Sequence, residues 1–157
     1  MSGRAPKEST METISSYMQQ DHVLIDGIAE RAAAAAAARD WTAFARDGAE
    51  FLQRLRRHIQ VEERLLFPAF ELRTGMTTAG PSVQTRVEHE QMAPILQQME
   101  AALAARDATG FQLSTKALFD ILVPHNQKEE QMMYPMLDEA VGAEAGALLA
   151  QAREMAS

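Results

Sequence analysis

Two segments of this chain carry almost the same pattern of residues, and this repetition limits the possible folds more than any other feature of the sequence. HIQVEERLLFPAFE starts at His58, and HNQKEEQMMYPMLDE starts at His125, 67 residues further along. In each segment a glutamate stands four residues after the histidine, at Glu62 and at Glu129, and an aromatic residue and a proline follow in step. The same offset relates Phe44 to Phe111, Leu55 to Leu122, Arg39-Asp40 to Arg106-Asp107, and Asp21-His22 to Glu88-His89. All four histidines therefore pair at one spacing, which predicts two copies of one helical hairpin around a pseudo-twofold axis.

The chain is predicted to be helical almost throughout, because Ala, Leu, Met, Glu, Gln and Arg dominate it and runs of β-branched residues are missing. We expect four long helices, at about residues 10 to 38, 40 to 73, 81 to 106, and from the turn at 107 to 110 up to about 141. Asp40 is a candidate N-cap, and a short C-terminal helix is expected after Gly142. Short connections place successive helices side by side in opposite directions. The expected fold class is all-α, an up-down antiparallel four-helix bundle with an internal 67-residue repeat.

Composition limits the chain to one domain and excludes some partners. A length of 157 residues with 46% apolar residues suits a single hydrophobic core. We divide the chain into a flexible N-terminal tail at residues 1 to 9, the bundle at 10 to 141, and the short C-terminal helix at 142 to 157. A net charge of -7 argues against nucleic acid as a partner, because phosphate backbones bind clustered Lys and Arg. No stretch approaches the roughly 20 apolar residues of a membrane span, so no membrane partner is expected and the cytoplasm is the expected location.

The repeated His and Glu residues fall within the apolar stripes that face the core. The stripe expected in the second helix contains Phe44, Phe51, Leu55, His58, Glu62, Leu65, Ala69 and Leu72. The fourth helix repeats it as Phe111, Leu118, Leu122, His125, Glu129, Met132 and Met136. His22 and His89 fall in the stripes of the first and third helices, while Met133, Phe67 and Tyr134 are expected to pack in the core.

Two buried, ionised glutamates cost several kcal/mol each unless something compensates their charge, so the inner polar cluster needs an explanation. One interpretation is a hydrogen-bonded network of His and Glu that fixes the register of the bundle. The other is a metal centre, since His and Glu four residues apart share one helix face and reach inward together. Four imidazoles and two carboxylates, with no Lys or Arg in the stripes, favour the metal.

The donor atoms determine which metal is expected. Cys is absent, so any metal must take nitrogen and oxygen ligands. Two octahedral ions offer about twelve positions, of which four imidazoles, two bridging carboxylates and one bridging oxo or hydroxo oxygen leave about two open. Open positions on adjacent redox-active ions indicate small-molecule chemistry. The expected cofactor is two iron ions (Fe2+/Fe3+), although zinc or manganese could occupy the same ligands.

The order His22, His58-x-x-x-Glu62, His89, His125-x-x-x-Glu129 resembles the hemerythrin-like, or HHE cation-binding, domain over about residues 10 to 141. The segments EERLLFPAFE, GPSVQTRVEHEQ and KEEQMMYPMLD are similar to the sequences that such domains have at these places. The resemblance implies that the four histidines are terminal ligands of a non-haem di-iron centre and that the two glutamates bridge it. Members of the family bind O2 reversibly, sense oxygen, iron or redox state, or handle nitric oxide and peroxide.

The sequence departs from the oxygen-carrying members in two places. Ala93 stands where they have a fifth histidine, and Glu129 replaces an aspartate found one residue further on. The version with two His-x-x-x-Glu motifs resembles members linked to iron-centre repair, iron sensing and the response to nitric oxide. Without the fifth imidazole one ion is more open, and Asp26, Glu63 and Glu130 are the nearby candidates for an additional ligand or for supporting contacts.

Several functions are compatible with such a centre. The chain could bind a small ligand (O2, NO or H2O2), act as a di-iron peroxidase or O2-activating oxidase, or serve iron and redox sensing and iron-centre maintenance. A metal-free bundle is the structural alternative. Whether the chain is an enzyme is open at this stage, and the pattern assigns no catalytic residue, protein partner or reductant.

Overall fold

The computed structural model describes residues 12 to 156, and the predicted tail at residues 1 to 9 lies outside this range. The helices are α2 (Ile14–Ala38), α3 (Trp41–Val61), α4 (Phe67–Thr74), α5 (Pro81–Ala104), α6 (Ala108–Lys128), α7 (Tyr134–Val141) and α8 (Ala145–Ala156). Three short segments connect them: the π-helical turns η1 (Glu62–Leu66) and η2 (Glu129–Met133) and the 3-10 turn η3 (Gly142–Glu144). The described residues contain no strand, so the predicted all-helical class is confirmed.

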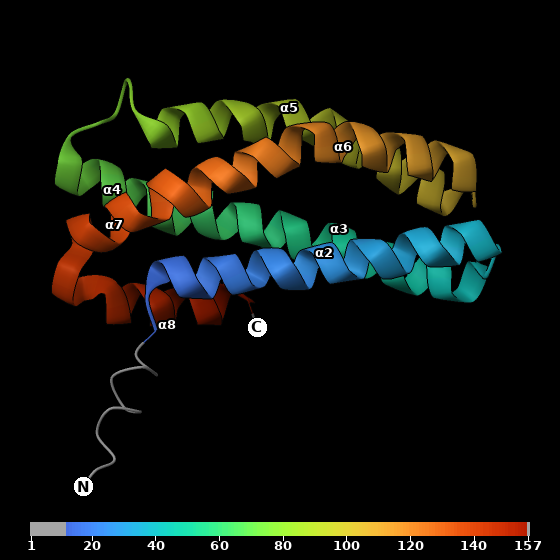
Figure 1. The fold of residues 1–157 in the computed structure, drawn as a ribbon, viewed down its shortest axis with the longest axis horizontal. Helices are drawn as coiled ribbons and strands as arrows, with labels where there is room; N and C mark the ends of the chain where they lie inside the picture. Colours follow the sequence, from blue (N-terminus) through green and yellow to red (C-terminus); the bar gives the residue numbers. More distant parts are fainter. Residues whose placement is uncertain (1–11, 157) are drawn as a thin grey trace, which may run out of the picture.

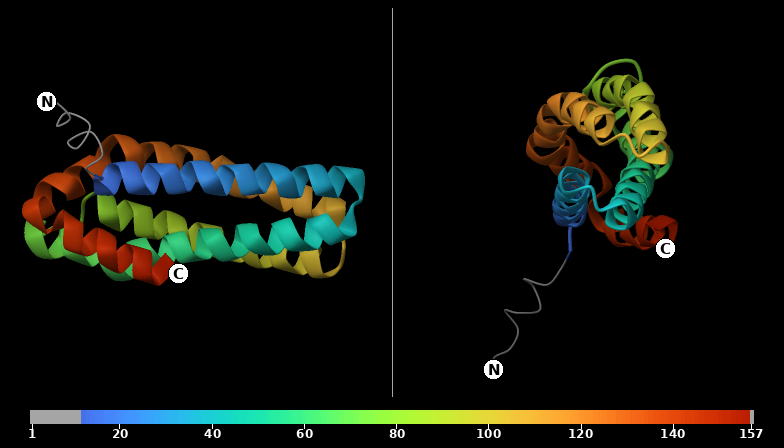
Figure 2. Two further views of the ribbon diagram at one scale, coloured as in Figure 1. Left: turned by 90° about the horizontal axis from the view of Figure 1, so that it is seen from below. Right: turned by 90° about the vertical axis from the view of Figure 1, so that its right-hand side faces the viewer.

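The helices form a four-helix bundle (Figure 1). α3, η1 and α4 follow one another as one long helical path, and α6, η2 and α7 form a second such path. α2 packs against α3, α5 packs against α6, and the view along the bundle shows the four paths around a common axis (Figure 2). α8 packs beside α3 and η1. The predicted bundle with a short C-terminal helix is therefore confirmed.

The two tight turns between paired helices use the same residues in the same conformations. The Asp40 carboxylate accepts a hydrogen bond from the Ala43 N–H at 3.2 Å, as predicted for an N-cap. Asp107 accepts one from Gly110 at 2.9 Å. The preceding arginines, Arg39 and Arg106, adopt left-handed backbone with φ of 55° and 53°. Each Arg-Asp pair thus ends one helix and starts the next.

A wide π turn begins at each of the two repeated glutamates, Glu62 and Glu129. The sequence analysis did not predict these turns. The Phe67 N–H donates to the Glu62 carbonyl, and the Tyr134 N–H donates to the Glu129 carbonyl, so each bond spans five residues instead of four. Pro68 follows directly; its ring lacks an N–H and would collide with the carbonyl four residues earlier in an α-helix. The wide turn relieves that collision, and π turns of this kind often occur at functional sites.

These turns change which side chains face the core. Because each turn holds one extra residue, the stripes predicted beyond the glutamates are wrong. Leu72 is 81% exposed and Met132 is 49% exposed, while the predicted core residues Leu65, Ala69 and Met136 are only half-buried. The buried positions are instead Leu66, Phe67, Phe70, Met133, Tyr134 and Leu137. Burial of Met133, Phe67 and Tyr134 agrees with the prediction.

The apolar core consists of two clusters with the polar layer between them. One cluster joins α2, α3, α5 and α6 toward the Arg-Asp turns and includes Phe44, Phe51 and Phe111. The other joins the start of α2 with η1, α4, η2, α7 and α8, and includes Phe67, Phe70 and Tyr134. Along each helical path the buried histidines lie between these clusters, so apolar side chains enclose the inner polar groups from both ends.

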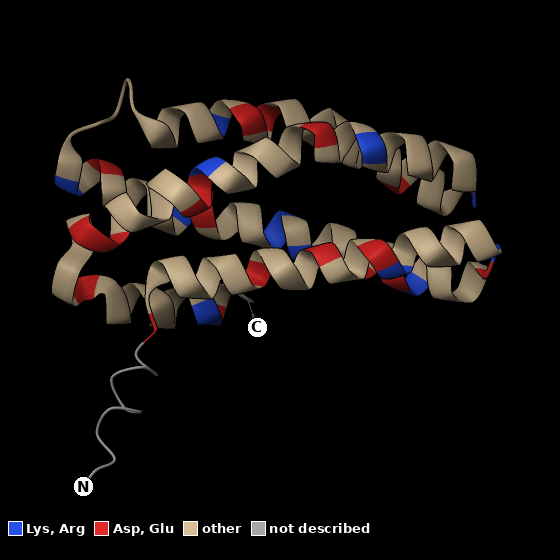
Figure 3. Ribbon diagram, in the orientation of Figure 1, with Lys and Arg blue, Asp and Glu red and all other residues tan. Residues whose placement is uncertain are grey.

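The surface carries both charge signs. Figure 3 shows both acidic and basic residues along the helices. Among the described residues, no helix combines the length and apolar character that crossing a bilayer requires.

Candidate metal centre

Six side chains from all four helical paths meet in the middle of the bundle. Two groups could each hold a metal ion, and within each group the donor atoms lie within 4.8 Å of one another. The first group contains His22 of α2 and His58 of α3, and the second contains His89 of α5 and His125 of α6. Glu62 and Glu129 belong to both groups, and all six residues are buried. The structure thus brings together every residue that the sequence analysis proposed as a main ligand.

The Nδ1 atom of each histidine, which faces away from the centre, lies within hydrogen-bond distance of a carboxylate oxygen. The Nδ1 atoms of His58 and His125 lie 2.7 Å from carboxylate oxygens of Asp21 and Glu88. The remaining two contacts are His22 Nδ1 to Glu130 at 2.7 Å and His89 Nδ1 to Glu63 at 2.6 Å. The four carboxylates follow the 67-residue offset as well. This arrangement fixes the ring orientation and the tautomer, which is how metal-binding histidines are commonly held.

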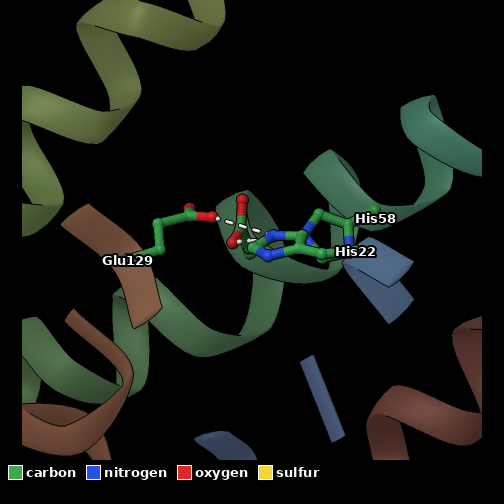
Figure 4. A group of neighbouring side chains, drawn as sticks. His22, His58 and Glu129 are labelled. Carbon is green, nitrogen blue, oxygen red and sulfur yellow. Dashed lines mark hydrogen bonds and ion pairs between the residues drawn. The ribbon is translucent and has the colours of Figure 1, made fainter. Parts of the chain in front are cut away.

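When a ring is neutral and carries its proton on Nδ1, the lone pair of its Nε2 points toward the centre. His22 Nε2 and His58 Nε2 lie only 3.1 Å apart, and their rings lie side by side facing Glu129 in Figure 4. His22 Nε2 is 3.2 Å from Glu129 Oε1. In the second group, His125 Nε2 is 3.2 Å from Glu129 Oε2. Lone pairs that face one another at these distances require either shared protons or a cation between them.

Among the residues that the structure describes, three buried side-chain atoms have no hydrogen-bond partner: Glu62 Oε1, Glu129 Oε2 and His89 Nε2. Glu62 Oε1 and His89 Nε2 lie 3.0 Å apart, but they lack the geometry of a hydrogen bond. Leaving such groups unsatisfied costs about 1–3 kcal/mol each, and more where they are charged. A cation that accepts all of these lone pairs removes this cost.

The spacing of the donor atoms also fits metal ions. Nitrogen and oxygen ligands about 2.1 Å from an ion lie roughly 3.0 Å from each other when they subtend a right angle. The donor contacts within the two groups range from 3.0 Å, between His89 Nε2 and Glu62 Oε1, to 3.5 Å, between His58 Nε2 and Glu62 Oε2. These separations therefore fit side chains that neighbour one another around a metal ion.

The electrostatics of the metal-free chain show how strongly these groups interact. Burial and the charge of Glu62 raise the pKa of Glu129 to about 8, so one of the two acids holds a proton at neutral pH. Burial alone would lower the pKa of His58, but the carboxylates of Glu62 and Asp21 outweigh it and raise that pKa to about 10. Burial lowers the pKa of His125. Metal binding releases such protons, because the ligands act in their deprotonated forms.

Cations outside the centre hold three of the four outer carboxylates. Arg54 pairs with Asp21, Lys128 pairs with Glu88, and Arg86 pairs with Glu63 at 2.7 Å. In residues 12 to 156 the fourth, Glu130, has no Lys or Arg partner within ion-pair distance. The position that matches Arg86 at the 67-residue offset is Gln19, which explains the difference.

Tyr134 also reaches the centre, which the sequence analysis did not foresee. Its hydroxyl lies 2.5 Å from Glu62 Oε2 and 2.8 Å from Glu129 Oε1. It is also 3.2 Å from His22 Nε2 and 3.4 Å from His58 Nε2. The sequence contained a signal, since an aromatic and a proline follow both glutamates, but the inward direction depends on the unpredicted π turn.

The three candidate additional ligands take different places. Glu63 and Glu130 support His89 and His22 through hydrogen bonds, as described above, and they lie outside both ligand groups. Asp26 is exposed and belongs to neither ligand group. The sequence analysis missed Asp21 and Glu88 as supporting residues, although each directly precedes a histidine.

Two surface pockets of about 270 Å³ each reach a histidine of the centre. One has His89 and Ala93 in its wall, together with Arg56, Ile59, Gln60, Leu96 and Gln97. The other has His22 and Asp26 in its wall, together with Gln19, Val23, Val123, Asn126, Gln127 and Glu130. Ala93 and Asp26 correspond at the 67-residue offset, so the two pockets occupy matching places.

Comparison with known proteins places this site in context. The family model described as "Hemerythrin HHE cation binding domain" matches residues 13–137, which include all six buried His and Glu residues. No curated protein and no solved structure matches the chain.

Proposed function

The chain belongs to the hemerythrin HHE cation-binding domain family, and from this we propose that it is a di-iron protein that binds or reacts with a small ligand. The proposed centre contains two iron ions and a bridging oxo or hydroxo oxygen. His22, His58, His89 and His125 are its terminal ligands, and Glu62 and Glu129 join the ions. Its candidate ligands are O2, NO and H2O2.

One observation carries this proposal. Four Nε2 atoms and two fully buried carboxylates converge, while the Nδ1 position of every ring is already used by a carboxylate. A network held together by protons alone leaves Glu62 Oε1, Glu129 Oε2 and His89 Nε2 without partners. Two shared cations satisfy all of these atoms, and imidazole with carboxylate is a donor set that suits iron.

The protein part of the site has three tasks. The outer carboxylates hold the imidazoles in one tautomer and orientation. Glu62 and Glu129 supply negative charge to both ions. The two apolar clusters exclude water from the ends of the site, and this strengthens the attraction between the carboxylates and the ions. Bound iron supplies the capacity to exchange electrons with a diatomic molecule or peroxide, which none of these side chains has alone.

The pocket beside His89 is the proposed route for the small ligand. Ala93 leaves space one helical turn from His89, and about 270 Å³ is ample for a diatomic molecule or peroxide. Arg56, Gln60 and Gln97 add hydrogen-bond donors to the wall. These donors favour a second candidate function, the reduction of peroxide, because they can bind a polar oxygen ligand during turnover.

Anaerobic loading with Fe(II), followed by elemental analysis and rapid mixing with O2, NO or H2O2, tests the proposal. We expect two irons per chain and a spectral change on mixing. A change that reverses when the ligand is removed indicates a binding protein, whereas repeated H2O2 consumption with a reductant indicates a peroxidase. If the spectrum changes on mixing only when a second protein is present, the result points instead to iron or redox sensing.

A matched pair of variants controls the experiment. Glu62→Ala removes a shared ligand, whereas Glu139→Ala removes an exposed acid of α7. Only the first should lose iron. Equal iron content in both variants, or a wild-type chain that retains no iron after desalting, would exclude the di-iron centre.

A further inference from the structure

We propose that the Tyr134 hydroxyl oxygen is itself a metal ligand, to the ion held by His22 and His58 and to no other. The inference rests on the proposed di-iron function and goes beyond it, because it makes the two ions chemically different. It adds a phenolate oxygen to a centre otherwise built from imidazoles and carboxylates.

The position of the hydroxyl is the first argument. Tyr134 is 0% exposed, and its oxygen contacts a donor atom of every member of the first group: Glu62, Glu129, His22 and His58. The distances, from 2.5 to 3.4 Å, scatter around the roughly 3.0 Å expected between neighbouring ligands of one ion. The oxygen therefore occupies the place of a fifth ligand in this group.

The number of available protons is the second argument. A phenol has one proton to donate, yet its oxygen faces two carboxylate oxygens and two imidazole nitrogens. Because the Nδ1 atoms of His22 and His58 are paired with Glu130 and Asp21, their Nε2 atoms present lone pairs. The phenol proton can bond to only one of these four atoms at a time. A cation in the middle attracts all five donor atoms, and the phenol proton leaves to solvent when the ion enters.

The second group provides an internal control. Phe67 stands at the position that matches Tyr134 at the 67-residue offset, and it is also fully buried behind a π turn. Its ring stacks on His89 at 5.9 Å between centroids, and it has no donor atom. The second ion thus lacks this ligand, and the pocket at Ala93 lies on the same side. The structure leaves the second ion open while the phenolate fills a position on the first.

The test uses light absorption and resonance Raman spectra of the ferric protein, with iron content measured on the same samples. A tyrosine oxygen bound to Fe(III) gives a visible charge-transfer band and enhances the ring vibrations of tyrosinate. We expect both signals in the wild type and in Tyr17→Phe, where Tyr134 is the only tyrosine left. We expect Tyr134→Phe to lose both signals while it retains two irons per chain.

The Tyr17→Phe protein keeps the question answerable if Tyr134→Phe fails to fold or to load, because its tyrosinate signal can arise only from Tyr134. Phe67→Tyr places a second phenol beside the other ion and should add a second band. Two irons without any tyrosinate signal in Tyr17→Phe would overturn the ligation and leave the di-iron function intact. A chain without iron would instead overturn the proposed function.

Discussion

The two ligand groups of this bundle are built from corresponding residues, yet they differ at their innermost and outermost positions. Both groups contain two histidines, each supported by a carboxylate at 2.6 to 2.7 Å, and both use the same two glutamates. Inside, the first group meets Tyr134 where the second meets Phe67. Outside, Asp26 in one pocket corresponds to Ala93 in the other.

The comparison teaches which features the repeat retains and which it varies. The inner His and Glu residues and their supporting acids recur in both halves, and in the proposed centre they hold the two cations. The aromatic side chains behind the glutamates and the residues one turn after His22 and His89 differ between the halves. In the proposed centre, those positions set how many further ligands each ion can accept. We therefore assign ion binding to the repeated part and ligand selectivity to the varied part.

The largest expected effect comes from removing what both groups share. Glu62→Ala should abolish loading of both ions, because the carboxylate serves each of them. Loss of one ion that is present at about 1,000 times its dissociation constant costs about 4 kcal/mol, or roughly 10 °C in melting temperature for a chain of this size, and loss of both costs about twice as much. Elemental analysis and thermal unfolding followed by circular dichroism measure both effects. Loss of only one ion would show that the two groups are independent.

A smaller effect should follow from substituting the supporting acids one group at a time. Asp21→Asn weakens the hold on His58, and Glu88→Gln does the same to His125. Each should lower metal affinity by roughly 10–100-fold, because such partners orient the ring and strengthen its basicity. Competition with a chelator gives the affinities. Equal losses of metal affinity in the two variants would support matched roles for Asp21 and Glu88. Unchanged affinity in Glu88→Gln would show that only Asp21 is needed to support its histidine.

Filling the two pockets one at a time should show which of the two proposed ions binds the small ligand. Ala93→Leu places a branched side chain beside His89, and Asp26→Leu does the same beside His22. We expect NO binding to the ferrous protein to weaken roughly tenfold in Ala93→Leu, equivalent to about 1.4 kcal/mol, and to stay near wild type in Asp26→Leu. Rapid-mixing titrations measure this. The opposite order would place the open ion in the first group.

The smallest effect concerns the metal-free chain, where the groups differ in proton binding. The folded pKa values of His58, about 10, and Glu129, about 8, lie above their unfolded values, so the protonated forms stabilise the fold at low pH. This stability is lost as pH rises through about 8 and then about 10. The melting temperature of the metal-free chain should fall between about pH 6 and 10. The iron-loaded chain should not follow, because metal binding tightens as protons are removed.

Ring NMR titration of the metal-free chain separates the two groups directly. His58 should remain protonated at neutral pH, whereas burial lowers the pKa of His125 and keeps its ring neutral. Identical titration curves for the two rings would contradict the difference.

The sequence predicted which His and Glu side chains meet in the interior, because helix periodicity and the 67-residue offset both act on positions before the π turns. His58 and Glu62 lie on the regular part of their path, so counting in steps of three and four finds their direction. Beyond Glu62 the count fails, and Leu72 is exposed although it was expected inside. No residue type predicts a π turn reliably, but Pro68 and Pro135 indicate that the regular α-helix is disturbed just before them. The role of Asp21 was also missed, because it depends on a contact between helices and not on spacing within one helix.

The π turns have a consequence for anyone who alters or aligns this chain. Successive residues of an α-helix are rotated by about 100°, so one extra residue in a regular helix would turn every later side chain by that amount. The π turn absorbs this rotation, because the bond from Tyr134 to Glu129 spans five residues instead of four. Removing a single residue between Glu129 and Tyr134 would therefore close the turn to α-helix and leave the inner face of α7 in place, but it would restore the collision at Pro135.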